Sequence, residues 1–157
     1  MVYVFDTNSF IVLSHYYKDQ FPSLWKNIGS QVKANKIISV KEVFNEIELY
    51  VPETDLKKWA RENKKIFQPM NEEESQIMSD IFKEYPKFQN MVDRKSRLQG
   101  KPVADPFIVA KAIHIKGTVI SEETFQKNGI KIPNLCKVKS IPCLKLKDFM
   151  KKHNWSF

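Results

Sequence analysis

Short runs of β-branched and aromatic residues alternate with longer segments of helical spacing, and this alternation limits the fold more than any other feature of the sequence. The runs that predict strands lie at residues 2–5, 37–38, 118–121 and 138–141. The segments between them carry helix signals; an expected helix over 105–116, for example, has Pro106 in its first turn and ends at Gly117. Strands that alternate with helices predict an α/β fold with a mostly parallel sheet covered by helices on both faces.

Length and composition bound the domain number and the class of protein. The chain has 157 residues, the size of one ordinary domain with one core. Hydrophobic residues make up 42% and charged residues 28%, as in folded rather than disordered proteins. The apolar runs are far shorter than the ~20 residues that cross a bilayer, and the N-terminus lacks the pattern of a signal peptide. We therefore expect a cytoplasmic protein without a membrane partner.

Basic residues are concentrated in two parts of the chain, and the formal net charge is +8. Residues 126–157 contain eight lysines and one aspartate. A second basic run consists of Arg94, Lys95, Arg97 and Lys101. Such patches attract polyanions, so nucleic acid is a natural partner and these four residues are candidate contacts. A lysine-rich surface that serves solubility explains the same charge, so charge alone does not choose between the two interpretations.

Cysteine and histidine residues do not form a recognisable zinc site. Cys136 and Cys143 lack a second pair at zinc-finger spacing, and the three histidines are scattered singly. We interpret the cysteines as buried free thiols. No glycine-rich nucleotide-binding motif follows any expected strand.

Acidic residues occur at the points where expected strands end and helices begin. Asp6 directly follows the run at 2–5, Glu123 lies just after 118–121, and Asp105 begins a helix. In parallel α/β sheets, ligands bind outside the carboxyl ends of the strands, so this placement indicates a site. Helix capping explains Asp6 and Asp105 without a ligand, and both interpretations stay open.

Glu46 is a fourth candidate because it lies beside the apolar face of an expected helix. It adjoins Ile47 and lies three residues beyond Val43. A carboxylate at the edge of a buried face is costly unless it is paired or bound to a metal. Glu42 is the alternative to Glu46, and Glu122 is the alternative to Glu123.

Four segments, taken in order, resemble the motifs of the PIN-domain nucleases. They are Asp6-x-Asn8 after a hydrophobic strand, Ser39-x-x-x-Val43-x-x-Glu46-Ile47, Ala104-Asp105-x-x-Ile108-Val109-Ala110, and Val119-Ile120-Ser121-x-Glu123-x-Phe125. The chain is most similar to stand-alone bacterial PIN-like proteins related to the toxin ribonucleases of toxin-antitoxin pairs. It differs from them in two places, because the family more often has aspartate at the position of Glu123 and threonine at that of Ser121.

The resemblance implies a fold, a site and an activity. The fold is a PIN-like three-layer α/β/α domain over 1–157, with a helical insertion around 54–99. The activity is divalent-metal-dependent hydrolysis of RNA phosphodiester bonds by an endoribonuclease. The implied ligands of Mg²⁺ or Mn²⁺, which are also the catalytic residues, are Asp6, Glu46, Asp105 and Glu123, supported by Asn8 and Ser121.

The resemblance also implies partners. They are RNA, an antitoxin or DNA-binding regulator, and a second copy of the chain in a homodimer. The number of metal ions, one or two, stays open. The alternative function is a catalytically inactive PIN-like module that binds RNA or a protein, in which the acidic residues serve as helix caps and ion-pair members.

Overall fold

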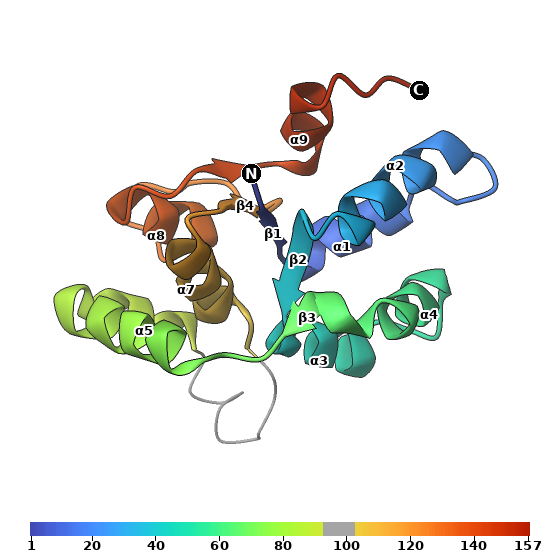
Figure 1. The fold of residues 1–157 in the computed structure, drawn as a ribbon. Helices are drawn as coiled ribbons and strands as arrows, with labels where there is room; N and C mark the ends of the chain where they lie inside the picture. Colours follow the sequence, from blue (N-terminus) through green and yellow to red (C-terminus); the bar gives the residue numbers. More distant parts are fainter. Residues whose placement is uncertain (93–102) are drawn as a thin grey trace.

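A computed structural model describes residues 1–92 and 103–157, and the centre of this part is a parallel β-sheet (Figure 1). Its strands are β1 (Tyr3–Phe5), β2 (Ile37–Val40), β3 (Phe67–Gln68), β4 (Thr118–Ile120) and β5 (Cys143–Leu144). They lie in the order β3-β2-β1-β4-β5, and each neighbouring pair is parallel. Every residue of β1, β2 and β4 is buried, as a parallel sheet covered on both faces requires.

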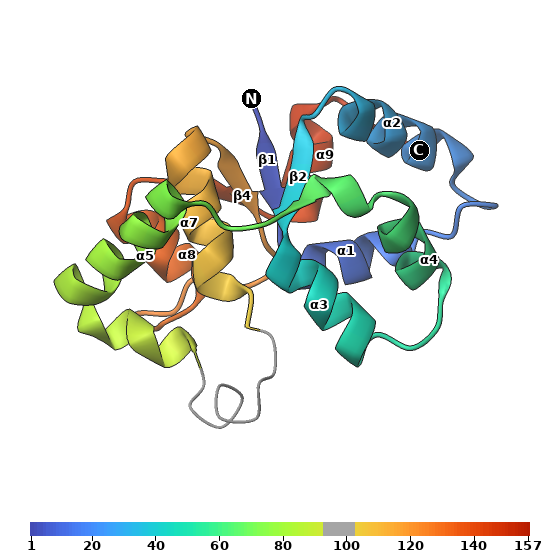
Figure 2. The same ribbon diagram turned by 60° about the horizontal axis from the view of Figure 1, so that its bottom comes forward.

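Helices cover both faces of the sheet, which confirms the expected three-layer α/β/α fold (Figures 1 and 2). One layer contains α5 (Glu72–Glu84), α7 (Asp105–Ile115) and α8 (Ile132–Val138). The other contains α1 (Thr7–Ser14), α2 (Pro22–Lys33), α3 (Lys41–Tyr50), α4 (Asp55–Glu62) and α9 (Leu146–Lys152). Two 3₁₀ helices, η1 (Lys64–Ile66) and η2 (Pro86–Met91), connect longer elements.

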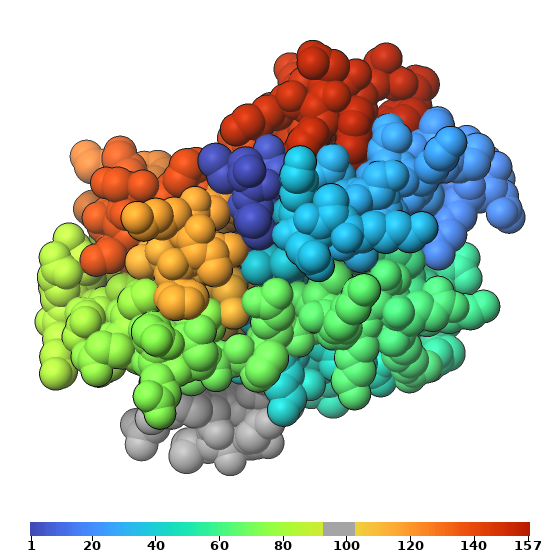
Figure 3. All heavy atoms as spheres, in the orientation of Figure 1, coloured from blue at the N-terminus to red at the C-terminus, as the bar shows by residue number. Residues whose placement is uncertain are grey.

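The core lies where these layers meet the sheet. Phe5 of β1 contacts Phe10 of α1 and Phe149 of α9, with ring centroids 5.3 and 5.4 Å apart. These three rings are completely buried, and the burial of each contributes about 1.5–3 kcal/mol. In the space-filling view, the side chains of the two helical layers close over the sheet and the N-terminal segment remains visible between them (Figure 3). None of the helices in the described part of the chain is long and apolar enough to cross a membrane.

The strand register brings the carboxyl ends of β1 and β4 to the same edge of the sheet. Phe5 lies opposite Ile120, so β1 and β4 finish together. The N–H of Asp6 donates a hydrogen bond to the carbonyl of Ile120 over 3.0 Å. Residues that follow β1 and β4 therefore meet at the carboxyl edge of the sheet.

Gly117 makes the close approach of β4 to β1 feasible. α7 ends at Ile115, and the residue after it, Lys116, has a φ of 54° in the left-handed region. A Cβ atom on residue 117 would lie 2.8 Å from the carbonyl oxygen of Val2. This position therefore needs glycine for the close approach of the two strands, whereas the left-handed residue at the end of the helix, where the sequence pattern favours glycine, is Lys116.

Two strands differ from the expectation. The prediction of a strand at 138–141 is wrong, because this segment is the end of α8 and the turn that follows it. The strand in this part of the chain is β5, which comes after the turn. β3 lies within the segment 54–99, which carries α4 and α5 but also this edge strand. β3 and β5 are two residues long, and so short a run shows no alternation of apolar and polar residues.

Candidate active site

Asp6 is the first residue after β1, and its carboxylate caps α1. Its Oδ1 accepts a hydrogen bond from the N–H of Ser9 over 2.7 Å, and the residue is 3% exposed. The capping interpretation is therefore confirmed for Asp6. The Ser9 hydroxyl donates to the carbonyl of Ile120 over 2.9 Å, which ties the start of α1 to the end of β4.

Glu46 lies half-buried in the middle of α3 and joins three elements. Its Oε2 accepts a hydrogen bond from the Thr7 hydroxyl over 3.0 Å. Its Oε1 accepts another from the N–H of Ala104 over 2.8 Å. Thr7 begins α1 and Ala104 precedes α7, so the Glu46 carboxylate holds the starts of these two helices beside α3.

Asp105 is the first residue of α7, and the capping interpretation is wrong for this residue. Ala104 occupies the N-cap position, and no side-chain hydrogen bond caps the helix. Burial is the largest cause that raises the pKa of Asp105, and the charges of Glu123, Glu46 and Asp6 add to it, so that the pKa reaches about 7. Lys131 acts in the opposite direction. The structure thus brings the other three predicted acids close enough for their charges to act on Asp105.

Glu123 follows β4 and faces this group of carboxylates, whereas Glu122 does not. Glu123 Oε2 accepts a hydrogen bond from the N–H of Ile132 over 2.7 Å. Oε1 of the adjacent Glu122 accepts one from the N–H of Leu146, at the start of α9, over 2.7 Å. Since Glu123 raises the pKa of both Asp6 and Asp105, the structure favours it as the fourth member. We call Asp6, Glu46, Asp105 and Glu123 the acidic cluster.

Burial and like charge raise the pKa of Asp6 and Glu46 as well. For Asp6, burial dominates, hydrogen bonding with Ser121 and Ser9 counteracts it, and the charge of Glu123 adds to it. For Glu46, burial again dominates, the hydrogen bonds from Thr7 and Ala104 counteract it, and the charge of Asp6 adds to it. The ionised cluster is therefore costly, and a proton or a cation relieves that cost.

The chemistry of the acidic cluster fits a divalent cation. Carboxylate oxygens are the ligands that Mg²⁺ and Mn²⁺ prefer in proteins. Within residues 1–92 and 103–157, however, no three Asp, Glu, His or Cys side chains are already arranged to hold a metal ion. Hydrogen bonds with the protein engage Asp6, Glu46 and Glu123. Binding of an ion therefore requires these side chains to move toward it.

The other predicted residues are placed differently. Ser121 is buried, and its Oγ accepts a hydrogen bond from the N–H of Glu123 over 3.2 Å. Asn8 is exposed on α1, and its side chain forms no hydrogen bond with another described residue. Glu42 is half-buried one turn before Glu46, where the charges of Glu74 and Lys111 also act on it. The predicted nucleic-acid contacts Arg94, Lys95, Arg97 and Lys101 lie outside the described residues.

Thr7 and Ser9 are site residues that the sequence reasoning missed. Both lie in the first turn of α1, and each donates a side-chain hydrogen bond to a group at the carboxyl edge of the sheet. The motif Asp6-x-Asn8 passes over them. A signal was available for Ser9 alone, which is a hydroxyl residue three positions after a helix-capping aspartate and so lies in the first turn beside the strand end.

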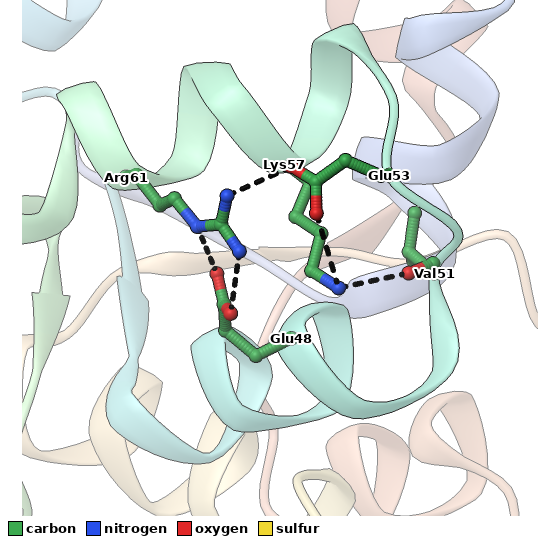
Figure 4. A network of polar contacts seen from close by, with 5 residues as sticks. All are labelled: Glu48, Val51, Glu53, Lys57 and Arg61. Carbon is green, nitrogen blue, oxygen red and sulfur yellow. Dashed lines mark hydrogen bonds and ion pairs between the residues drawn. The ribbon is translucent and has the colours of Figure 1, made fainter.

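Glu48 and Glu53, at the end of α3 and just after it, form ion pairs on the surface and do not belong to the acidic cluster. Figure 4 shows the Arg61 guanidinium of α4 bound to both Glu48 oxygens, over 2.8 and 3.0 Å, and to Glu53 over 2.8 Å. Lys57 lies 3.8 Å from Glu53 and donates to the carbonyl of Val51. These exposed pairs place α4 against the end of α3, and each contributes at most about 1 kcal/mol.

Two hollows flank this region. One of about 370 Å³ adjoins the acidic cluster, because Glu123 and Ser121 form part of its wall. A larger, mostly apolar hollow of about 540 Å³ lies between the ends of α1 and α3 and the start of α4. No residue of the acidic cluster lines the larger hollow, so the smaller one is the chemically relevant space.

Comparison with known proteins identifies one family to which the chain belongs. A family model described as a domain of unknown function, DUF4411, matches residues 3–157. No curated protein and no solved structure matches the chain.

Proposed function

Because the chain belongs to the DUF4411 family over nearly its whole length, we propose one activity for the whole domain: metal-dependent endoribonucleolytic hydrolysis of RNA phosphodiester bonds. The proposal combines the resemblance to the PIN-domain nucleases with the position of the acidic cluster. A three-layer α/β/α fold places ligands at the carboxyl edge of its sheet, and the cluster gathers there.

The observation that carries the proposal is the environment of Asp105. Its pKa of about 7 reflects burial together with the charges of Glu123, Glu46 and Asp6. With Asp105 itself, these residues come from four separate segments of the chain. Gathering like charges at one point costs stability. Strongly perturbed acids that converge in this way are typical of functional sites.

The acidic cluster would hold Mg²⁺ or Mn²⁺, which lowers the pKa of a bound water and stabilises the leaving oxygen of the phosphodiester. The protein's own groups hold these carboxylates near the edge of the sheet, from which they would move toward the ion. The Thr7 hydroxyl and the Ala104 N–H hold the two oxygens of Glu46. Ser9 and Ser121 favour the ionised form of Asp6, which is the form that binds cations.

We infer the biological setting from the resemblance alone. In this proposal the protein is the toxin of a toxin-antitoxin pair and acts on RNA in the cytoplasm. It pairs with an antitoxin or DNA-binding regulator and functions as a homodimer. A gene for a small DNA-binding protein beside the gene for this chain supports this setting, and its consistent absence in close relatives contradicts it.

A second function is a catalytically inactive module that binds RNA or a protein. One observation favours it: the carboxylates of Asp6, Glu46 and Glu123 are already engaged by protein hydrogen bonds. In that case the acids serve as helix caps and links between elements. Cleavage of RNA that depends on added metal distinguishes the two functions.

The test is an RNA cleavage assay with Mn²⁺ and with EDTA. Asp6→Asn retains an oxygen that can accept the hydrogen bond from Ser9, and Asp105→Asn removes one charge from the cluster. We expect each variant to fold and to lose at least about 100-fold in cleavage rate. Glu53→Gln, which changes an exposed acid on the surface, is the matched control and should cleave like the wild type. Full activity in both Asn variants, or equal cleavage in EDTA, contradicts the proposal.

A further inference from the structure

The hollow beside Glu123 combines features that suit a nucleotide. Its wall includes Glu123 and Ser121 on one side and Phe125, Lys145 and Lys147 elsewhere. Asp148 is the other acidic residue of the wall. The hollow therefore borders the acidic cluster at Glu123, and the wall of this space of about 370 Å³ contains an aromatic ring and two cations.

Phe125 is an exposed aromatic ring that contributes nothing to the core. The residue is 45% exposed and does not pack against the hydrophobic core. Lys137 lies over its ring, with Nζ 4.6 Å from the centroid. An exposed ring is accessible to a ligand, and a ring held by a cation on one side can still stack with a base.

The segment that carries Phe125 is held in place. The Asn134 side chain of α8 donates from Nδ2 to the carbonyl of Gln126 over 2.6 Å and accepts from the Gln126 N–H over 3.4 Å. The ring therefore lies on a positioned segment, which lowers the entropic cost of binding.

The lysines of the hollow are available to an anion. Lys145 donates a hydrogen bond to the Thr124 hydroxyl over 3.1 Å, and Lys147 is exposed on α9. Neither forms a salt bridge with an acidic residue in the part of the chain that the structure describes. Lysine charges of this kind bind phosphate groups of the nucleic-acid backbone.

We propose that this hollow binds one nucleotide of single-stranded RNA beside the scissile bond, with its base stacked on Phe125 and its phosphate held by Lys145 and Lys147. This inference rests on the proposed function, because it takes the acidic cluster as the place of cleavage. It adds a substrate class. Only an unpaired base can offer its face to the ring, so the site selects single strands over duplexes.

The test measures binding of a short labelled RNA by fluorescence anisotropy in EDTA, where the proposed cleavage does not run. We expect Phe125→Ala to raise the Kd for single-stranded RNA about ten-fold and to leave the binding of a duplex of the same sequence unchanged. Phe125→Trp should retain the wild-type affinity. Lys147→Gln should lower the slope of log K against log salt by about 0.7 for the single strand.

Tyr17→Ala is the matched control, because it removes an aromatic ring that is 66% exposed and lies outside the hollow. Its affinity for RNA should equal that of the wild type.

Equal affinity of wild type and Phe125→Ala for single-stranded RNA, or equal affinity of the wild type for single strand and duplex, overturns the inference. Absence of RNA binding by the wild type also overturns it. Asp105→Asn separates the two proposals: retained binding without cleavage supports both. If the wild type cleaves no RNA but binds it in a way that depends on Phe125, the proposed nuclease activity is rejected and the proposed stacking site is supported.

Discussion

Asp105 shows the cost of gathering the acidic cluster. Its carboxylate lies at the start of a helix, where a negative charge is usually favourable. Burial and three neighbouring carboxylates outweigh that benefit and raise its pKa to about 7. A residue of this kind lowers the stability of the fold, and its negative charge can bind a cation.

The raised pKa of Asp105 predicts how stability depends on pH. The metal-free folded protein keeps a proton on Asp105 up to about pH 7, while the unfolded chain releases it near the ordinary value of 3.8. The folded state therefore binds more protons between these values, and the free energy of unfolding decreases as the pH rises from about 4 to about 7. Asp105→Asn should reduce this decrease and raise the free energy of unfolding at pH 8 by on the order of 2 kcal/mol.

Urea denaturation in EDTA at several pH values checks this prediction. Asp6 and Glu46 also have raised pKa values, so part of the slope should persist in the variant. If the free energy of unfolding depends on pH in the same way in wild type and in Asp105→Asn, the raised pKa of Asp105 is contradicted.

At the scale of elements, α7 is the part of the fold that positions the cluster. It begins at Asp105, and Lys111 in its second turn is almost completely buried. Lys111 Nζ lies 2.6 Å from Glu74 Oε1 of α5 and donates to Gln68 Oε1 of β3 over 3.1 Å. Glu74 also takes part in a capping box with Asn71. This buried pair sets the position of α7 between α5 and the sheet.

Loss of one partner of this pair should destabilise the fold strongly. Lys111→Met leaves the Glu74 carboxylate buried without a counter-charge, so we expect the free energy of unfolding to decrease by about 3 kcal/mol. Lys111→Met with Glu74→Gln removes both charges and should recover part of the loss. Glu53→Gln, in the exposed network of Figure 4, should cost less than about 1 kcal/mol. Guanidinium denaturation of the four proteins tests the prediction, and a double variant less stable than Lys111→Met contradicts it.

At the scale of the whole molecule, the order of the strands assembles the site. β1 lies at the centre of the order β3-β2-β1-β4-β5, so the residues after β1 and β4 meet at one edge. α3 and α7 add Glu46 and Asp105 from segments far away in the chain. An ion bound at this point links four segments and should stabilise the complete fold.

Mn²⁺ should therefore raise the melting temperature of the wild type. A ligand that binds only the folded state at a hundred times its Kd adds about 2.7 kcal/mol to stability. The double variant Asp6→Asn/Asp105→Asn should lose this response. Differential scanning calorimetry with Mn²⁺ and with EDTA measures it, and an equal rise in both proteins places the ion elsewhere.

Much of this protein was readable from its residues. The apolar run before Asp6 specifies β1, because a strand buried on both faces needs apolar side chains throughout. Pro106 indicates the start of α7 through its fixed backbone angle, whereas the helix ends with Lys116 in the left-handed region and Gly117 is needed for the close approach to Val2. The four acids were candidates from the sequence alone, because each stands next to a strand end or an apolar helix face, and their role as ligands stays a prediction.

Only the tertiary structure decided how these residues meet. β3 and β5 exist because neighbouring strands supply their hydrogen bonds, which no two-residue run can indicate by itself. The choice of Glu123 over Glu122 depends on the N–H groups of Ile132 and Leu146, and both lie in elements that follow later in the chain. The raised pKa of Asp105 likewise arises from burial and from charges contributed by distant segments. Local preference acts over a few neighbouring residues, whereas burial and Coulomb repulsion act through space, so they take effect only after the chain has folded.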